Sequence, residues 1–349
     1  MITIGVDFHK RTSSYTVLDD KGLMITQCKL ENTPDNIKQF LNKWPQPKQL
    51  AMEATYNWGL YFDTTETYVD RFMLGHPAKM RAITESESKC DRHDAKAIAH
   101  LAMIGYLPKA YIPTKEARDL RSLVRLRSFF IRQRVAIRNK TQALLDRNIW
   151  PSERPPSFKN IYCKRGIKWM KELNLPVKER FILDELLKSF EQLNIQIQTV
   201  DSYVETTACD MPAVKCLRTV PGLRNSKIHL YTILFEIDDV QRFPRARDLI
   251  RYAGLIPSEH SSGEKQRTGH LIQRANHALR TALIESAFSA VLADKHLKAY
   301  YRQTKERNNS SAAIVACARK LGYAIYHVLK EQRAFRPFPP VAAPGPFAV

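Results

Sequence analysis

Residues 2–7 read Ile-Thr-Ile-Gly-Val-Asp, and this stretch decides how the N-terminal part of the chain folds. Its three branched apolar residues alternate with threonine and glycine, and this period of two predicts a β-strand that ends at the charged Asp7. A second strand is predicted near 14–18 and a third near 24–30, with the turn sequence Asp-Asp-Lys-Gly at 19–22 between them. The chain is therefore predicted to open with an antiparallel meander.

Helices and strands alternate after the meander. A helical pattern over 36–44 leads to a short strand at 49–54, and a further helix precedes an apolar strand at 71–74 that Gly-His-Pro at 75–77 stops. A meander followed by alternating helices and strands is the element order of an RNase H-like mixed sheet. We therefore expect an α/β domain of this class at the N-terminus.

The charge of the chain is strongly unbalanced. Its 349 residues include 55 Lys and Arg against 35 Asp and Glu, for a formal net charge of +20. Such an excess destabilises a compact chain by self-repulsion unless a polyanion binds it, and nucleic acid is the first candidate. An anionic membrane surface is the second, but the chain has no basic amphipathic terminus and no apolar run near the roughly 20 residues that span a bilayer. We expect a cytoplasmic, nucleoid-associated protein without a membrane partner.

The region after about residue 114 changes to helix and concentrates basic residues. Apolar residues over 115–140 recur at helical spacing, and only Glu116 and Asp119 offset the cations of this stretch. One interpretation is a solvated coiled-coil face, and the other is a surface that follows a phosphate backbone without reading sequence. The cations proposed for phosphate contacts are Arg121, Arg125, Arg127, Arg132, Arg134, Arg138 and Lys140.

A later helix carries a coiled-coil seam. After the Pro-rich stretch 151–156, apolar residues recur in alternating steps of three and four over about three heptads. They are Leu183, Leu186, Phe190, Leu193, Ile197, Val200 and Val204. Packing within an antiparallel hairpin and contact with a second subunit fit the seam equally well.

Acidic residues fall at three places suited to a metal site. Asp7 ends the first strand, Glu53 ends a later strand, and Asp91 and Asp94 lie three residues apart in a strongly helical stretch, hence on one helical face. Each acid alone is more often a cap, a turn residue or a solvated position. Brought together in this order of elements, the four would repel one another unless divalent cations bind them. Mg²⁺ prefers such oxygens, and Mn²⁺ can substitute for it.

Several motifs resemble one family, the DEDD-type insertion-sequence transposases. The resemblance is carried by GVDFHK at 5–10, MEAT at 52–55, KCDRHDAKAIA at 89–99, RFPRARDLIRYAGLIP at 242–257 and SSGEKQRTGHLI at 261–272, with NHALR at 276–280. It implies metal ligation by Asp7, Glu53, Asp91 and Asp94, and a nucleophilic serine at Ser262, with Ser261 as the alternative. Lys265, Arg267, Arg274 and Arg280 would form a basic surround suited to a scissile phosphate.

The same resemblance implies a fold and partners. It implies a RuvC-like domain over 1–112 and a mainly helical transposase domain with the serine over 213–332. The basic helix and coiled-coil seam described above occupy the region between them, 113–212. The tail 333–349, rich in Pro and Ala, is predicted to be disordered.

The activity implied is cutting and rejoining of donor and target DNA through a covalent serine–DNA link. A structured bridge RNA would guide it, and the chain would act as a dimer or tetramer. Two alternatives stay open. One is a RuvC-like nuclease or junction resolvase that uses water as nucleophile, and the other is a nucleic-acid-binding protein without catalysis.

Overall fold

The computed structural model describes residues 1–81, 91–154, 160–224, 226–262 and 265–339, and only the backbone of 81, 91–93, 259–262 and 265–268. The chain divides into two compact units, Met1–Lys115 and Glu116–Val349. The first unit ends close to the predicted boundary at residue 112.

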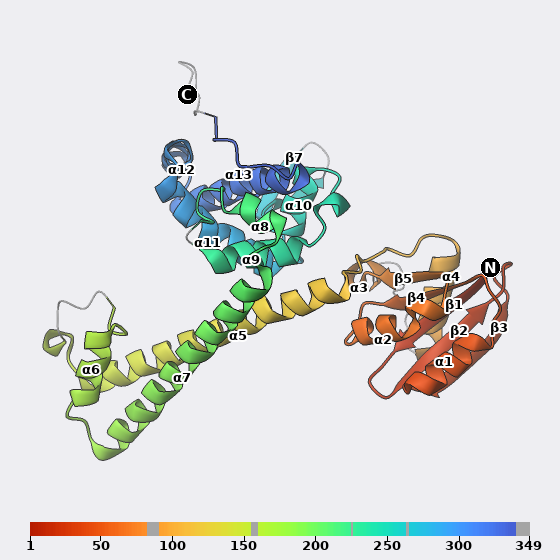
Figure 1. Cartoon of the computed structure of the whole chain (residues 1–349), viewed down its shortest axis with the longest axis horizontal. Coiled ribbons are helices and arrows are strands. Elements are labelled where there is room, and N and C mark those ends of the chain that lie inside the picture. Colours follow the sequence, from red (N-terminus) through yellow and green to blue (C-terminus); the bar gives the residue numbers. More distant parts are fainter. Residues whose placement is uncertain (82–90, 155–159, 225, 263–264, 340–349) are drawn as a thin grey trace. The chain divides into compact units, whose positions relative to one another are not determined.

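The first unit is built on a five-stranded mixed sheet in the order β3-β2-β1-β4-β5 (Figure 1). Its strands are β1 Ile2–Phe8, β2 Thr12–Leu18, β3 Met24–Glu31, β4 Lys48–Glu53 and β5 Arg71–Gly75. The first three pair antiparallel as the predicted meander, whereas β4 and β5 are added in parallel on the other side of β1. The strands predicted from the period-two pattern are thus confirmed, and β1 is central because both halves of the sheet pair with it.

Helices cover the two faces of this sheet. Apolar side chains of β1 and β4, including Ile4 and Met52, form a core with α1 Pro34–Asn42 and α2 Trp58–Thr65 on one face. On the other face, Ala51 packs with Ile98 and Ala102 of α4 Asp91–Met103, and α3 Pro77–Arg81 adds Met80 to this cluster. Each strand alternates its side chains between the two layers. Because β1 and β4 are buried on both faces, the fold permits only small residues where a helix backbone approaches closely.

The second unit begins with a long antiparallel helix pair, α5 Lys115–Asn148 and α7 Val177–Ala208, with the short α6 Lys164–Glu172 at the end where they connect (Figure 1). Leu183 and Leu187 of α7 share a buried cluster with Leu144 and Leu145 of α5. The predicted seam is therefore largely buried within the chain, although Leu187 rather than Leu186 takes the buried position of its turn.

The remaining helices pack into one core that also includes the N-terminal part of α5 and the C-terminal part of α7. They are α8 Pro212–Leu217, α9 Lys227–Ile237, α10 Ala246–Tyr252, α11 His277–Ala293, α12 Lys295–Arg307 and α13 Ser310–Lys330 (Figure 1). Strands β6 Pro257–Ser262 and β7 Lys265–Leu271 form a separate two-stranded sheet between α10 and α11 in the chain. The regions predicted as separate, 113–212 and 213–332, thus share a hydrophobic core. By length and composition α13 could cross a membrane, yet 61% of its most apolar stretch is buried inside this unit, as expected of a core helix.

The C-terminal tail differs from the prediction of disorder where the structure describes it. Over 333–339 the chain packs against the helical core through Phe335 and Phe338, and the Phe335 amide donates to Thr219 Oγ1 at 2.8 Å. Residues 340–349 lie outside the described part of the chain. The aromatic side chains explain the difference, because they bury apolar surface that the Pro- and Ala-rich composition does not reveal.

Candidate functional site

Two of the predicted acidic residues lie beside each other at the carboxyl ends of neighbouring strands. Strands β1 and β4 are parallel with Val6 opposite Met52, so Asp7 and Glu53 occupy the next positions of the two strands. Residues opposite each other in parallel strands project to the same face. Asp7 and Glu53 therefore share the face that also carries Gly5 and Ala51, which is the face covered by α4.

The direction of α4 brings its first turn toward the same end of the sheet. A Cβ built on Gly5 would lie 2.2 Å from Ala95 O and 2.6 Å from Ala99 N, so the helix backbone rests directly on β1. Further along α4, Met103 approaches Gly22 in the turn that follows β2, next to the start of β1. The helix thus runs from the carboxyl end of β1 toward its amino end, and its opening residues lie on the side of Asp7 and Glu53.

Asp91 is the first residue of α4, and Asp94 lies one turn further on, directly before Ala95. The Asp94 side chain is exposed, Glu53 is half-buried and Asp7 is nearly buried. The Asp91 side chain lies outside the described part of the structure. Acids in the first turn of a helix have two explanations. The helix dipole stabilises negative charge there, and a bound cation would do so too.

The electrostatic setting of Asp7 includes a histidine. His9 Nε2 lies 3.0 Å from Asp7 Oδ2, and 49% of the His9 side chain is exposed against 12% of the Asp7 side chain. Among the side chains that the structure describes, which exclude Asp91, no three Asp, Glu, His or Cys residues gather closely enough to hold a metal ion. The donors that converge on this end of the sheet are carboxylate oxygens, the ligand type that hard divalent cations select.

The predicted nucleophile lies at the tip of a β-hairpin in the second unit. Ser262 is the last residue of β6 and pairs with Lys265, the first residue of β7, while Ser261 pairs with Gln266 and His260 with Arg267. The side chains of these six residues are outside the described part. The backbone register nevertheless brings the basic positions 265 and 267 alongside the end of the strand that carries the serine.

Arg280 fixes the base of this hairpin. Its guanidinium donates from Nε to Ala253 O at 3.1 Å, before β6, and from Nη2 to Ile272 O, after β7. Gly254 has φ +68°, and a Cβ there would lie 2.0 Å from Arg280 Nη2, so only glycine lets the arginine pass. Arg280 thus joins both ends of the hairpin rather than presenting its charge to solvent, whereas Arg274 is exposed.

A buried polar network lies next to the hairpin base. Glu236 of α9 has no exposed surface and accepts two hydrogen bonds from Arg125, at 2.8 and 2.9 Å. It also accepts one from Asn276 Nδ2 at 2.8 Å, and this amide donates to Tyr252 OH as well. Asn276 Oδ1 caps the first turn of α11 by accepting from the Leu279 amide. The charge-assisted bonds raise the pKa of Arg125 through its pairing with Glu236, and they connect α5, α9, α10 and α11.

Several cations of α5 that were proposed for phosphate contacts have partners within the chain. Arg121 donates to Phe235 O and Glu236 O at the end of α9, and Arg127 pairs with Asp201 of α7. Arg134 donates to Asn194 Oδ1 at 2.8 Å, and the Arg138 guanidinium lies 4.7 Å from the centre of the Tyr162 ring. Arg132 and Lys140 are exposed. Phosphate contact stays a prediction for this set, but the structure already gives most of these side chains a role in holding the helix pair and the core together.

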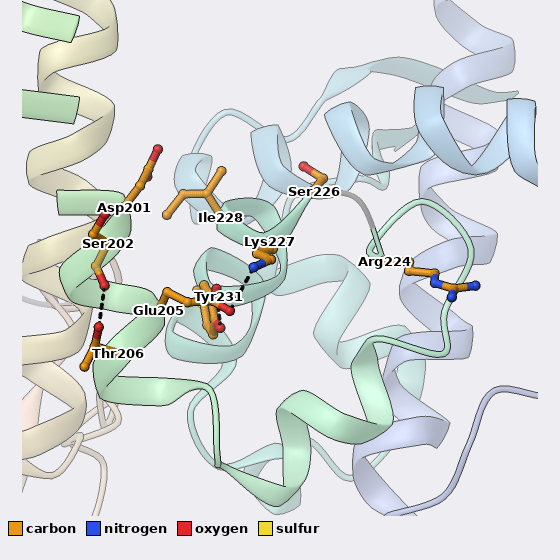
Figure 2. Close-up of a pocket in the computed structure, with 9 residues that line it drawn as sticks. All are labelled: Asp201, Ser202, Glu205, Thr206, Arg224, Ser226, Lys227, Ile228 and Tyr231. Carbon is orange, nitrogen blue, oxygen red and sulfur yellow. Dashed lines mark hydrogen bonds and ion pairs between the residues drawn. The ribbon is translucent and has the colours of Figure 1, made fainter. Parts of the chain in front are cut away.

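An open pocket of about 840 Å³ lies between α7 and α9 (Figure 2). Glu205 projects into it and accepts hydrogen bonds from Tyr231 OH at 2.8 Å, Lys227 Nζ at 3.0 Å and Arg218 Nη2 at 3.0 Å. Burial raises the pKa of Glu205, but the hydrogen bonds from Tyr231 and Lys227 outweigh it and hold the pKa below its usual value. The pocket therefore contains a satisfied ion cluster that ties the helix pair to the core.

The sequence reading missed Glu236 and the polar role of Asn276. A detectable signal was present, because Glu236 is the one polar residue in the otherwise apolar run 233–237. A carboxylate inside an apolar helix is rarely buried without a cationic partner. The partner itself, Arg125, lies 111 residues away along the chain and could not be identified from local pattern.

Two family models match the chain. Residues 4–150 match the model of a transposase family of the DEDD type found in IS110, and residues 214–302 match the model described as the transposase IS116/IS110/IS902 family. Among individual relatives, a "Probable family 20 transposase" of Pseudomonas aeruginosa is 23% identical over 96% of this chain and 98% of its own length. The transposase for insertion sequence element IS1111A of Coxiella burnetii is 25% identical over 71% of this chain and 69% of its length. The transposase for IS1328 of Yersinia enterocolitica is 24% identical over 81% of this chain and 82% of its own length.

Proposed function

The chain belongs to the IS110/IS116 family of insertion-sequence transposases, and from this premise we propose that it joins DNA covalently to Ser262 during strand exchange. In this proposal Asp7, Glu53, Asp91 and Asp94 bind a divalent cation, most naturally Mg²⁺. The observation that carries the proposal is the convergence of Asp7, Glu53 and the start of α4 on one end of one sheet face. The RuvC-like assignment of this unit is likewise proposed, and the sheet order β3-β2-β1-β4-β5 supports it.

The donor set fits a hard divalent cation. All four candidate ligands are carboxylates, and carboxylates crowded at one site favour the bound cation because it relieves their mutual repulsion. When bound, such a cation would lower the pKa of a hydroxyl group and offset charge on the phosphoryl oxygens. Asp7, which is nearly buried on a central strand, would hold its oxygen in a fixed position.

The serine would supply the nucleophile. A bond forms between Ser262 Oγ and phosphorus while the bond from phosphorus to the leaving strand oxygen breaks. The serine hydroxyl gives up its proton in this step, and the leaving oxygen takes up a proton. Attack by a strand end reverses these changes. Because the number of phosphoester bonds is conserved, rejoining requires no nucleotide. The reaction requires that Ser262 and the carboxylates meet at one phosphate, within one chain or between two copies.

Positioning of the serine would depend on the hairpin base. Arg280 holds both ends of the β6–β7 hairpin, and Asn276 connects the following helix to the buried Glu236. A nucleophile on a rigidly held hairpin loses less freedom on reaching the transition state than one on a free loop. Lys265 and Arg267, which pair alongside the serine end of β6, would contact the scissile phosphate.

The guide RNA and the oligomer are further parts of the proposal. The net charge of +20 and exposed cations such as Arg132 and Lys140 support a polyanionic partner, which could be DNA or RNA. The bridge RNA rests on the resemblance noted in the sequence motifs, and a discrete RNA that stays with the protein through a high-salt purification step would support it. Dimers or tetramers of this chain would be detected by mass measurement of the complex with RNA and DNA.

Covalent trapping tests the serine mechanism directly. Protein, Mg²⁺, candidate RNA and labelled element-end DNA are mixed, denatured and resolved beside the variants Ser262→Ala, Ser261→Ala and Asp7→Ala. We expect a labelled protein–DNA adduct with wild type and Ser261→Ala, and none with the other two variants. Mixing Ser262→Ala with Asp7→Ala tests for a site shared between copies, because only such a site would restore the adduct.

Two outcomes would count against the proposal. An adduct that moves to Ser261 would reassign the nucleophile. Cleavage without any adduct that survives Ser262→Ala but not Asp7→Ala would identify a nuclease that uses water, with the carboxylates still catalytic.

A further inference from the structure

Helix α12, Lys295–Arg307, carries a line of cations that the sequence reading did not identify. Lys295, Lys298, Arg302 and Lys305 follow one another in steps of three, four and three, which brings all four to one face of a helix. All four are exposed. At 1.5 Å per residue the line extends over roughly 15 Å of the helix. We refer to these four residues as the α12 stripe.

The opposite face of α12 holds the helix in place. Leu297 is buried in the helical core, and the half-buried Tyr300 and Tyr301 pack against that core. The Lys320 ammonium of α13 lies 3.8 Å from the centre of the Tyr300 ring. Asp294 caps the first turn by accepting from the Leu297 amide at 2.8 Å. The stripe is therefore presented outward on a helix that is packed against the core and capped at its first turn.

The stripe has no ion-pair partner among the described residues, although Asp294 and Glu306 lie next to its two ends. Within the described residues, none of the four side chains makes an ion pair or hydrogen bond, and Glu306 is the one acid of the helix. Like charges three or four residues apart destabilise a helix by a few tenths of a kcal/mol per pair, and a cation at the first position also opposes the helix dipole. The α5 arginines differ from the stripe, because several of them form ion pairs or hydrogen bonds with residues of α7 or α9.

We propose that the α12 stripe is a contact surface for the phosphate backbone of duplex DNA. Charge complementarity carries the proposal, since a regular line of unpaired cations on a rigid helix matches a regular line of phosphates. Duplex DNA is the chosen occupant because DNA is the substrate of the transposase family to which the chain belongs. Contacts of this kind position the duplex without reading its sequence. The inference needs neither the serine nor the carboxylates.

Salt-dependent binding tests the proposal. Affinity for a duplex of unrelated sequence is measured in EDTA, so that no strand is cut, for wild type and for the triple variant Lys298→Gln, Arg302→Gln, Lys305→Gln. Loss of three phosphate contacts should reduce the slope of log affinity against log salt by about 2.7. Equivalently, the ratio of the wild-type DNA affinity to the variant DNA affinity should fall roughly 40-fold between about 50 and about 200 mM salt.

A matched control variant removes the same number of positive charges from another surface of the protein. Lys164, Arg165 and Lys178 are exposed cations of the distal end of the α5–α7 pair, again two lysines and one arginine. Changing them to Gln should leave the slope within about 0.5 of wild type, because general charge loss is screened beyond a Debye length. The charge-preserving variant Lys298→Arg, Arg302→Lys, Lys305→Arg should keep the wild-type slope and excludes misfolding as the cause.

Equal slopes for the stripe variant and the control would overturn the proposal. So would a slope loss seen with an RNA duplex of the same sequence but not with DNA, which would assign the stripe to RNA. A stripe variant that binds DNA normally but changes the mass of the free protein would assign it to a contact between copies. Because all arms run without cleavage, failure of the serine mechanism affects none of them.

Discussion

Substitution of Gly5 by alanine should disable the carboxylate site without touching any carboxylate. The added Cβ would lie 2.2 Å from Ala95 O, 2.6 Å from Ala99 N and 2.7 Å from Ala99 Cβ. Two of these three atoms belong to the helix backbone and cannot rotate away. Helix α4 must therefore move off the sheet, and it carries Asp91 and Asp94 with it while Asp7 and Glu53 stay on their strands.

The size of the effect follows from these distances. Restoring ordinary contact requires a shift of about 1 Å, and overpacking of this kind costs about 1–3 kcal/mol, with the upper end expected where backbone is the obstacle. A misplacement of about 1 Å at a reacting centre lowers the rate by roughly 100-fold. We therefore expect Gly5→Ala to fold with a lower Tm and to form the serine–DNA adduct about 100 times more slowly.

The assay is the initial rate of adduct formation at saturating Mg²⁺, with thermal unfolding of the same samples. Lys96→Ala is the control, because Lys96 is an exposed residue of α4 and its truncation leaves the packing of the helix on β1 intact. It should keep both the rate and the Tm. Adduct formation by Gly5→Ala at the wild-type rate would refute the reasoning, since the close contact between α4 and β1 would then not govern the position of the acids.

Three further predictions concern charges with different partners. Arg125→Ala should lower the free energy of unfolding by about 1–3 kcal/mol in urea titrations, because it leaves the buried Glu236 short of its cation, whereas Arg132→Ala should stay within about 0.5 kcal/mol and weaken nucleic-acid binding. The loss for Arg125→Ala should be smaller than that for a fully buried pair because 58% of the Arg125 side chain is exposed. Mg²⁺ at about 100 times its Kd should stabilise the wild-type chain by about 2.7 kcal/mol in thermal shifts against EDTA, and Asp7→Asn should abolish the gain. The lowered pKa of Glu205 contributes stability above its unfolded value near about pH 4.3, and this contribution disappears as the pH falls through the lower folded pKa. Glu205→Gln should therefore reduce the difference in unfolding free energy between about pH 6 and about pH 3, and an unchanged difference would refute this role.

The sheet could be predicted from the sequence because each strand has a recognisable local pattern of apolar residues. Alternation over residues 2–7 and the turn at 19–22 determine a meander, and the following elements fix its extension. The positions of Asp7 and Glu53 at strand ends followed from the same pattern. The contact of α4 with Gly5 did not, because it depends on packing between elements about 90 residues apart in the chain.

The roles of the arginines could not be separated from the sequence for a similar reason. Helical spacing shows which cations share a face, but it does not show what that face meets. The partner of Arg127 is 74 residues away and that of Arg125 is 111 residues away, so both looked like free cations of a basic helix. The α12 stripe has a regular spacing of three, four and three, and this signal was detectable in the sequence.

The distribution of charge also constrains the order of events. A cluster of carboxylates repels phosphates, so the proposed catalytic site would oppose DNA before its cation is bound. The excess of +20 lies instead in cations elsewhere on the chain, including the α12 stripe. In the proposed mechanism, attraction and chemistry would be separate functions. The cationic surfaces would hold DNA with or without Mg²⁺, and the metal would decide whether a phosphate can approach the acids. DNA affinity that persists in EDTA while adduct formation disappears is the behaviour this division requires.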